Sequence, residues 1–334
     1  MFPRDDTIFI VWGQPGQGPR SQVLARELGI DALHFISAPM KRGLLLAPLR
    51  YAYQAVQTLR LLFRKRPRLV LVQSPPSLAV LFVHLYCALT GNHYLIDAHS
   101  MAFAPYWTYP RWLHRRLARR ALATIVTNDH LRRTVEQWGG RAFVLRDIPT
   151  RFPRVDGRAP GGDFSVVVVN SFAPDEPLDQ VLEAAADLND IQFYVTGRFR
   201  DGSRKLADSA PANVHFTGFL PNDEYYGLMA ASQAVVCLTN RDHTMQRGAC
   251  EALWMGKPII TSDWPMLREY FSGGTVYVPS GSAEIRQGVL EMKANHAHYL
   301  RGIQELQIAR RNEWQEKVRM LTELVESGVQ GARN

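Results

Sequence analysis

The feature that most constrains the fold is a regular alternation of strand-like and helix-like segments along the whole chain. Six short apolar runs bounded by turn residues occur between residues 7 and 147, and six more occur between residues 164 and 278. Most of these runs are followed by a segment with apolar residues at helical spacing. Because such alternation is typical of domains built on mainly parallel sheets, we expect an α/β protein.

A linker-like stretch separates the two series of strands. IPTRFPRVDGRAPGGD, residues 148–163, is rich in Pro, Gly and Arg. A chain of 334 residues is long for one core and comfortable for two. We therefore predict two Rossmann-like domains that face each other across a cleft. They are an N-terminal domain at 1–150, a C-terminal domain at 160–300, and a helix at 301–334 that packs back toward the N-terminal domain.

The compartment is predicted from cysteine usage and from the apolar segments. The three cysteines are odd in number and widely spaced, which favours buried free thiols in a reducing compartment. The first residues lead almost directly into the strand-like TIFIVWG, so we expect no secretory signal. The longest apolar stretch, SLAVLFVHLYCALTG, is shorter than the roughly 20 residues that a membrane span needs. We expect a cytoplasmic protein.

The formal charge of +8 is unevenly distributed along the chain. Residues 32–96 and 98–128 contain thirteen of the 39 basic residues and none of the 31 acidic ones. The remainder of the chain is net acidic. The first half is therefore expected to have a positive face that the second half lacks.

Two helix-like stretches within this basic region, 48–66 and 111–121, combine arginines with apolar and aromatic residues. An ordinary solvated helix face, nucleic-acid binding and docking on an anionic membrane are the three interpretations. Aromatic residues together with arginines are typical of helices that lie in a membrane interface. No nucleic-acid-binding motif accompanies the stretches. We favour peripheral association with an anionic membrane surface, and we predict no nucleic-acid partner.

The first strand is followed by a glycine-rich turn, VWGQPGQGPRS, that contains Gly13, Gly16 and Gly18. Glycines let the backbone approach a ligand closely, and exposed amides can hold a phosphate. The order of the glycines differs from that of the common dinucleotide fingerprint, and Pro19 stands where a Walker loop needs lysine. A tight strand-to-helix turn is the alternative interpretation.

The fourth strand ends in LIDAHSMAF, which contains Asp97 and His99. Residues two apart on a strand point the same way, so a carboxylate would lie beside an imidazole. This pair is sufficient for a general base that takes a proton from a hydroxyl group. The alternative is that Asp97 caps the following turn while His99 packs in an interface. Catalytic groups collect at the carboxyl ends of strands in open α/β sheets, which favours a catalytic role.

Candidate ligand-binding residues follow the strands of the second half. Ser171, Asp175 and Glu176 follow the first of these strands. Arg198 follows the second, where a guanidinium can clamp a diphosphate. The amides around Thr244 and Met245 precede a helix, and helix N-termini attract phosphate. Glu251, about two turns into that helix, can accept two hydrogen bonds from the hydroxyls of a ribose. A surface acid paired with Lys257 or Arg247 is the alternative for Glu251.

The segment ACEALWMGKPIITSDWPMLREYF resembles the nucleotide-binding stretch of GT-B glycosyltransferases of the broad family-four kind. VQSPPS, LIDAHSMAF, VTNDHLRRTVEQWGGRAFVLRDIP and SFAPDEPLDQVLEAA resemble, in the same order, segments of the chitobiosyl-diphosphodolichol β-mannosyltransferases. The likeness covers roughly residues 70–275. It implies that Glu251 binds the donor ribose and Arg198 the donor diphosphate. It also implies that the Gly13–Gly18 loop and Asp97–His99 border the acceptor and the reacting carbon.

The sequence departs from the family pattern at two places. The family has two glutamates separated by seven residues, and His243 stands where the first of them is expected. A histidine can still donate a hydrogen bond to a sugar hydroxyl or accept one from it. The basic residue expected near the start of the second domain is replaced by the run NSFAPDEP.

We therefore expect a glycosyltransferase of the hexosyltransferase class. Its donor would be a nucleotide-sugar, and its acceptor a hydroxyl of a lipid-linked glycan or glycolipid precursor at the cytoplasmic membrane face. No Asp-x-Asp motif lies in a suitable loop, so we predict metal-independent chemistry without a cofactor. A sugar-nucleotide epimerase and a non-catalytic membrane scaffold with the same fold are the alternatives.

Overall fold

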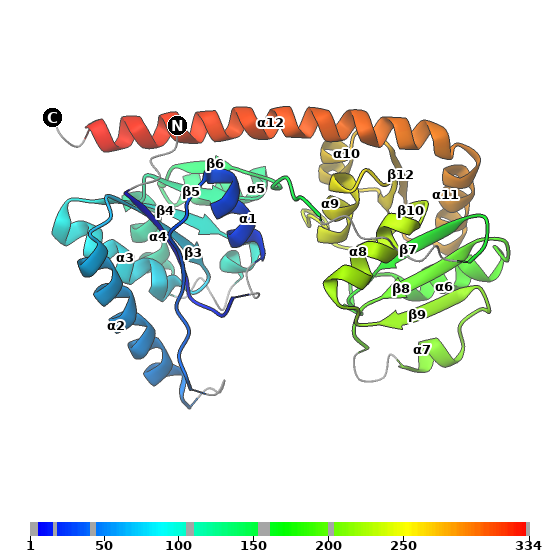
Figure 1. The fold of residues 1–334 in the computed structure, drawn as a ribbon, viewed down its shortest axis with the longest axis horizontal. Coiled ribbons are helices and arrows are strands. Elements are labelled where there is room, and N and C mark those ends of the chain that lie inside the picture. Colours follow the sequence, from blue (N-terminus) through cyan, green and yellow to red (C-terminus); the bar gives the residue numbers. More distant parts are fainter. Residues whose placement is uncertain are drawn as a thin grey trace. The chain divides into compact units, whose positions relative to one another are not determined.

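The computed structural model describes residues 6–15, 19–40, 45–104, 110–152, 161–199 and 204–331. The chain divides into two compact units, Met1–Pro149 with Glu313–Asn334, and Thr150–Asn312. Each unit contains a parallel six-stranded sheet with helices packed on both of its faces (Figure 1). The predicted α/β class is confirmed, and each of the twelve predicted strand segments overlaps a strand of the structure.

The sheet of the first unit has the strand order β2-β1-β3-β4-β5-β6. Its strands are β1 (Thr7–Val11), β2 (Leu33–Phe35), β3 (Leu69–Ser74), β4 (His93–Ala98), β5 (Ala123–Val126) and β6 (Ala142–Val144). The helices between them are α1 (Pro19–Leu28), α2 (Ala47–Lys65), α3 (Ser77–Thr90), the 3-10 helix η1 (Ser100–Phe103), α4 (Arg111–Arg120) and α5 (Asp129–Gln137).

Both faces of this first sheet are buried, as the continuous apolar runs of its strands require. Alternate strand residues such as Ile8 and Ile10 pack with helices α2, α3, α4 and α5 on one face. Phe9 and Val11 point to the other face, where α1 and the last part of the C-terminal helix α12 (His296–Gly331) cover them.

The sheet of the second unit has the strand order β12-β11-β10-β7-β8-β9. Its strands are β7 (Ser165–Val169), β8 (Gln192–Thr196), β9 (Val214–Gly218), β10 (Ala234–Cys237), β11 (Ile259–Ser262) and β12 (Thr275–Val278). Its helices are α6 (Leu178–Ala186), α7 (Arg204–Asp208), α8 (Asn222–Ala231), α9 (Arg247–Trp254), α10 (Pro265–Tyr270) and α11 (Ser282–Ala294). Helices α6 and α11 cover one face of the sheet, and α8, α9, α10 and the first part of α12 cover the other.

Each sheet contains one point at which the strand order reverses direction. In the first unit the chain moves outward from β1 to β2 and returns to β3 on the other side of β1. In the second unit the corresponding neighbours are β7 and β10. Ligands of open α/β sheets bind beyond the carboxyl ends of the strands at such a switch point. The candidate sites are therefore the loops that follow β1 and β3 in one unit, and β7 and β10 in the other.

Candidate active site

At the switch point of the first unit, the loop after β1 leads directly into α1. Gly13 lies in this loop, whereas Gly16 and Gly18 lie outside the described residues. The first turn of α1 is fixed to the neighbouring strand, because the Ser21 hydroxyl donates to Oε1 of Gln73 at 3.0 Å. The loop is thereby held beside the end of β3, where a substrate of an open sheet binds.

Asp97 and His99 meet at the end of β4. His99 Nε2 lies 3.2 Å from Asp97 Oδ2, and the Asp97 side chain is completely buried. Arg20 of α1 approaches the other carboxylate oxygen, with 3.5 Å between its Nε and Asp97 Oδ1. The same guanidinium donates to the carbonyl oxygen of Leu145 at 3.2 Å. Arg20 therefore connects the carboxylate on β4 to the segment that follows β6.

The electrostatics of this cluster favour an ionised Asp97. Burial alone raises the pKa of Asp97, but the nearby Arg20 and His99 outweigh burial and hold that pKa below its usual value. An ionised carboxylate can only accept hydrogen bonds, so His99 must donate its Nε2–H to Asp97. That tautomer leaves Nδ1 of the neutral ring as the nitrogen that can take up a proton. The arrangement is that of a base oriented by a buried acid.

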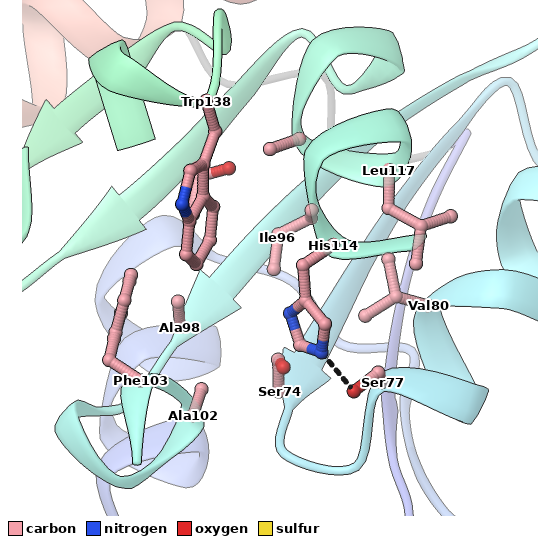
Figure 2. A pocket seen from close by; sticks show the side chains of 12 residues that line it. Ser74, Ser77, Val80, Ile96, Ala98, Ala102, Phe103, His114, Leu117 and Trp138 are labelled. Atoms are coloured by element: carbon pink, nitrogen blue, oxygen red, sulfur yellow. Dashed lines mark hydrogen bonds between the residues drawn. The ribbon is translucent and has the colours of Figure 1, made fainter. Parts of the chain in front are cut away.

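A separate small pocket lies on the opposite face of the same sheet, and Figure 2 shows its lining. Ile96 and Ala98 line it, whereas Asp97 between them points toward α1, because neighbouring strand residues face opposite ways. Inside it, His114 Nε2 lies 2.7 Å from the Ser77 hydroxyl oxygen. The void measures about 20 Å³, which is room for one water molecule rather than for a sugar. This pocket is therefore not the substrate site.

In the second unit, two glycines let the backbone crowd together at the end of β7. A Cβ on Gly197, whose φ is +118°, would lie 2.0 Å from the carbonyl oxygen of Asn170. A Cβ on Gly248, in the first turn of α9, would lie 2.6 Å from a methyl group of Val169. The residue after Gly197 and the N-terminus of α9 therefore both flank the end of β7.

Glu251 lies one turn further along α9 and is mostly buried. Its Oε2 accepts a hydrogen bond from the Tyr225 hydroxyl at 2.8 Å, and its Oε1 accepts one from Arg247 Nε at 2.7 Å. The pairing with Arg247 is one of the alternatives that the sequence left open. Lys257 instead donates to backbone carbonyl oxygens of α8 and the residue that follows it. Each carboxylate oxygen keeps a second lone pair that a further hydroxyl can use.

The loop after β7 is organised around the carboxylate of Glu176. The backbone N–H groups of Ser171 and Ala173 donate to its Oε2 at 2.7 and 3.0 Å, and the Ser171 hydroxyl donates to both oxygens. Phe172 between them has a positive φ of 55°, which turns the two amides toward one point. Such a concave pair of amides is an anion-binding arrangement, and here the chain supplies its own anion.

The loop after β10 is fastened to the loop after β7. The Thr239 hydroxyl donates to Asp175 Oδ2 at 3.0 Å, and the Asn240 amide donates to the Asp175 carbonyl oxygen at 2.7 Å. His243 in this loop has a positive φ of 57° and a half-exposed side chain near Asp242. The two loops at the switch point therefore form one structural unit.

Several polar groups at the start of α9 have no partner within the described part of the chain. The backbone amides of Thr244 and Met245 donate to no group there. Gln246, the N-cap residue, has a buried side-chain oxygen that accepts no hydrogen bond. Unpaired amides at a helix N-terminus attract anions, and a buried unpaired acceptor is costly unless a ligand or water satisfies it.

Arg198 stands at the end of β8, immediately after Gly197. Its guanidinium lies over the Phe219 ring, with Cζ 5.0 Å from the ring centroid. Phe172, Phe199 and Phe216 form an aromatic cluster beside it. The sequence pattern located this arginine at a strand end but gave no sign of its aromatic support.

Two residues that organise the sites, Arg20 and Tyr225, were not found from the sequence. Arg20 is 77 positions away from Asp97, so no local spacing connects them. Tyr225 lies in α8, whose apolar residues form no clear stripe that would mark its buried side. The run NSFAPDEP was noted as a departure from the family pattern, but the position of the Glu176 carboxylate depends on the turn at Phe172.

The described residues contain neither a metal-binding cluster nor a membrane-spanning helix. No group of three or more His, Cys, Asp or Glu side chains there is arranged to hold a metal ion. None of the described helices has the length and apolar character that a membrane crossing requires.

Comparison with known proteins identifies the fold. Residues 151–308, which are nearly all of the second unit, match the family model of glycosyl transferases group 1. No curated protein sequence matches the chain significantly. Sucrose-phosphate synthase from Thermosynechococcus elongatus is 14% identical, with a TM-score of 0.72 over 97% of this chain and 99% of that one.

Two further solved structures share the fold. HepE from Anabaena, in complex with UDP and glucose, is 15% identical, with a TM-score of 0.67 over 96% of this chain and 99% of that one. The lipopolysaccharide outer core galactosyltransferase WaaB is 14% identical, with a TM-score of 0.61 over 92% of this chain and 98% of that one. The predicted GT-B fold and the predicted glycosyltransferase activity are thus confirmed. The hexosyltransferase class and the finer resemblance to the β-mannosyltransferases stay predictions.

Proposed function

We propose that this GT-B glycosyltransferase moves a hexose from a nucleotide-sugar to a hydroxyl of a lipid-linked glycan or glycolipid precursor at an anionic membrane surface. The observation that carries the proposal is the match of residues 151–308 to the glycosyl transferases group 1 model. The UDP and glucose in the complex of HepE support a nucleotide-sugar as donor. The name of WaaB, an outer core galactosyltransferase of lipopolysaccharide, supports a lipid-anchored acceptor.

The donor is assigned to the carboxyl edge of the second sheet. Glu251 accepts hydrogen bonds from the ribose hydroxyls through its remaining lone pairs, while Tyr225 and Arg247 hold the carboxylate in position. The amides of Thr244 and Met245 donate to the diphosphate, and the Arg198 guanidinium neutralises its charge.

Two residues of the same edge are assigned to the sugar and the loop. His243 hydrogen-bonds a hydroxyl of the transferred sugar. Ser171 shapes the loop after β7 through its bonds to Glu176. Glu176 itself adds negative charge beside the amides of that loop, so we assign the diphosphate to the α9 side of the switch point.

The acceptor hydroxyl is activated at the end of β4 in the first unit. In an inverting reaction, His99 Nδ1 takes the hydroxyl proton as the acceptor oxygen attacks the anomeric carbon. The bond from that carbon to the diphosphate breaks, and the diphosphate leaves with the electron pair. Asp97 is a positioning residue that fixes the histidine tautomer and stabilises the imidazolium formed. In a retaining reaction a donor phosphate oxygen takes the proton instead.

The membrane part of the proposal is supported by an unusual distribution of side chains on α2. The buried face of this helix includes the polar residues Gln54 and Thr58 beside Ala55 and Leu62. Leu49 and Phe63 lie outside that face and are 62% and 47% exposed. A helix of a soluble domain normally turns its apolar stripe toward the core.

The same combination of apolar and basic side chains recurs on α4. Trp112 is 66% exposed, and all five arginines of that helix are exposed to solvent. Exposed apolar side chains among basic ones are typical of helices that lie in an anionic membrane interface.

A transfer assay tests the proposal. The protein is incubated with UDP-, GDP-, ADP- or dTDP-sugars and with lipid-linked or glycolipid acceptors in vesicles. We expect one donor to release its nucleoside diphosphate only when an acceptor is present. Formation of an epimerised donor without any acceptor would instead identify a sugar-nucleotide epimerase. If no nucleotide-sugar binds, the protein is a scaffold and the proposal is wrong.

A further inference from the structure

We propose that the side chains of His84, Arg116 and Arg120, between α3 and α4 in the first unit, bind the phosphate of an anionic phospholipid. This inference rests on the proposed membrane association and deepens it from a general attraction to a specific site. The helices α3 and α4 are neighbours on one face of the first sheet. None of the helices α2, α3 and α4 contains an aspartate or a glutamate.

The Tyr94 hydroxyl joins His84 of α3 to the second half of α4. Its oxygen lies 3.4 Å from His84 Nδ1, and it donates to the carbonyl oxygen of Leu117 at 2.7 Å. Leu117 lies between Arg116 and Arg120, which are four residues apart and therefore share one face of the helix. Burial lowers the pKa of His84, and the positive charges of both arginines lower it further. Because Coulomb energy falls with distance, both guanidinium groups must lie near the imidazole.

The two arginines of this cluster are accessible and lack a counter-ion. Arg116 and Arg120 are exposed, and neither forms an ion pair with any of the described residues. The acids of the next helix, Asp129 and Glu136 of α5, are already paired with Arg132. Like charges four residues apart on a helix repel each other, so an anion bound between the two arginines would stabilise this part of α4. Accessible cations without a counter-ion indicate an anionic ligand.

The donors of the cluster fit a phosphate. Each guanidinium can donate two parallel hydrogen bonds to phosphate oxygens. The Tyr94 hydroxyl uses its single proton on Leu117, so it accepts from the Nδ1–H of His84. An adjacent negative charge favours the protonated imidazole, whose Nε2–H is then free to donate to the phosphate as well.

The cluster is separate from the candidate active site. Helix α3 begins at Ser77, just after the carboxyl end of β3. His84 is seven residues further along the helix, which corresponds to about 10 Å. A ligand of the cluster therefore anchors the first unit without occupying the place where the acceptor hydroxyl is activated.

Two exposed leucines of α3 favour a membrane lipid as the source of the phosphate. Leu85 follows His84 directly and is 42% exposed, and Leu89, one turn further along, is 77% exposed. The helix contains no aspartate, glutamate, lysine or arginine. A free phosphate or a nucleic acid would leave these leucines in water, whereas the acyl region of a bilayer would bury them. Long arginine side chains can meanwhile extend to the headgroups.

Two variants of α4 with the same change of charge test the site. Arg120→Gln removes a guanidinium of the cluster, whereas Arg115→Gln removes an exposed one whose charge does not act on His84. Leu89→Gln tests the apolar contact, and Leu290→Gln, at a 46% exposed position of α11, is its control. Circular dichroism checks that all four variants are folded.

Each protein is titrated with a soluble short-chain phosphatidylglycerol and, separately, with inorganic phosphate. Flotation with vesicles of phosphatidylglycerol and phosphatidylcholine measures membrane binding. A single-stranded oligonucleotide is the competing polyanion.

We expect Arg120→Gln to weaken binding of the short-chain lipid about tenfold, as the loss of hydrogen bonds between charged groups does, and Arg115→Gln to leave it unchanged. On vesicles, Arg115→Gln should lower affinity only about fivefold, as one lost charge near an anionic surface does. Arg120→Gln should lower it further. Leu89→Gln should weaken binding of vesicles but not of inorganic phosphate, and Leu290→Gln should change neither.

Equal losses for Arg120→Gln and Arg115→Gln would contradict a specific site, even if the wild-type protein bound vesicles and the proposed membrane association held. Binding of inorganic phosphate as tight as that of the lipid, or a preference for the oligonucleotide over vesicles, would contradict the lipid assignment. If the wild-type protein ignored vesicles but bound the soluble lipid through Arg120, the membrane part of the proposed function would fail while the site itself stood.

Discussion

At the scale of single residues, the candidate site of the first unit depends on the buried carboxylate of Asp97, which lies between Arg20 and His99. Asp97→Asn removes the negative charge that orients His99 and pairs with Arg20. If His99 is the base, we expect kcat to fall at least 10²-fold with little change in the KM of the donor. Leaving Arg20 unpaired should also lower the free energy of unfolding by about 3 kcal/mol at pH 7.

The pH dependence of that loss of stability tests whether Asp97 is ionised in the folded protein. Because the pKa of Asp97 is lower in the folded protein than in the unfolded chain, its contribution to stability is fully present above the unfolded value, about 3.9. The contribution is lost as the pH falls through the lower, folded value. The free energies of unfolding of wild-type protein and Asp97→Asn, measured at several pH values, should therefore differ less in acid. A difference independent of pH would contradict an ionised Asp97.

A second residue-scale prediction concerns the crowded backbone of the other site. Gly197→Ala places a methyl group against the Asn170 carbonyl oxygen at a φ of +118°, which should cost at least about 3 kcal/mol of stability. Gly218→Ala is the matched control, since Gly218 has a φ of +70° but no atom within 4 Å of the added Cβ. The control should cost only about 1–2 kcal/mol. Equal melting temperatures for the two variants would show that the close approach at β7 is absent.

At the scale of elements, the exposed apolar residues of α2 predict binding to anionic membranes. Replacing Leu49 and Val56 together by Glu changes exposed positions, so stability should change by at most about 0.5 kcal/mol per site. Binding to anionic vesicles should fall more than tenfold, because each inserted side chain of this size contributes about 1.5–3 kcal/mol. Leu62→Ala, on the buried face of α2, should lower the free energy of unfolding and leave vesicle binding unchanged. Unchanged vesicle binding in the Glu variant would rule out insertion of these exposed residues.

The sequence predicted elements better than it predicted which face of an element is buried. Continuous runs such as SVVVV are buried on both sides, so their identity as parallel strands follows from composition alone. Asp97 could be selected because it lies at the end of such a strand, and Glu251 because it lies in the helix that follows one. The sequence also indicates the apolar face of 48–66, but its exposure depends on the hydrogen bonds of Gln54 to Ile36, just after β2, and of Thr58 to Trp12. Contacts between residues so far apart in the sequence cannot be predicted from the spacing of residues within one helix.

At the scale of the whole molecule, the C-terminal helix returns to the first part of the chain. Within the first unit, Trp314, Leu321 and Val325 of α12 pack in one core with residues of β1, α1 and β3. Leu321→Ala should lower the free energy of unfolding of this unit by about 2–5 kcal/mol. Met320→Ala, at a 43% exposed neighbour, is the control and should have a small effect. Chemical denaturation followed by tryptophan fluorescence separates the two results.

The central claim is that the second unit grips a nucleotide-sugar through the carboxylate of Glu251. The most direct measurement is calorimetric titration of UDP-, GDP-, ADP- and dTDP-sugars into wild-type protein, Glu251→Ala and Glu269→Ala, the last removing a carboxylate from α10. We predict that one donor binds the wild type and the Glu269 variant equally, and that Glu251→Ala weakens it at least tenfold, as expected for hydrogen bonds to a charged group. Equal affinity in all three proteins, or no binding to any, would contradict the claim.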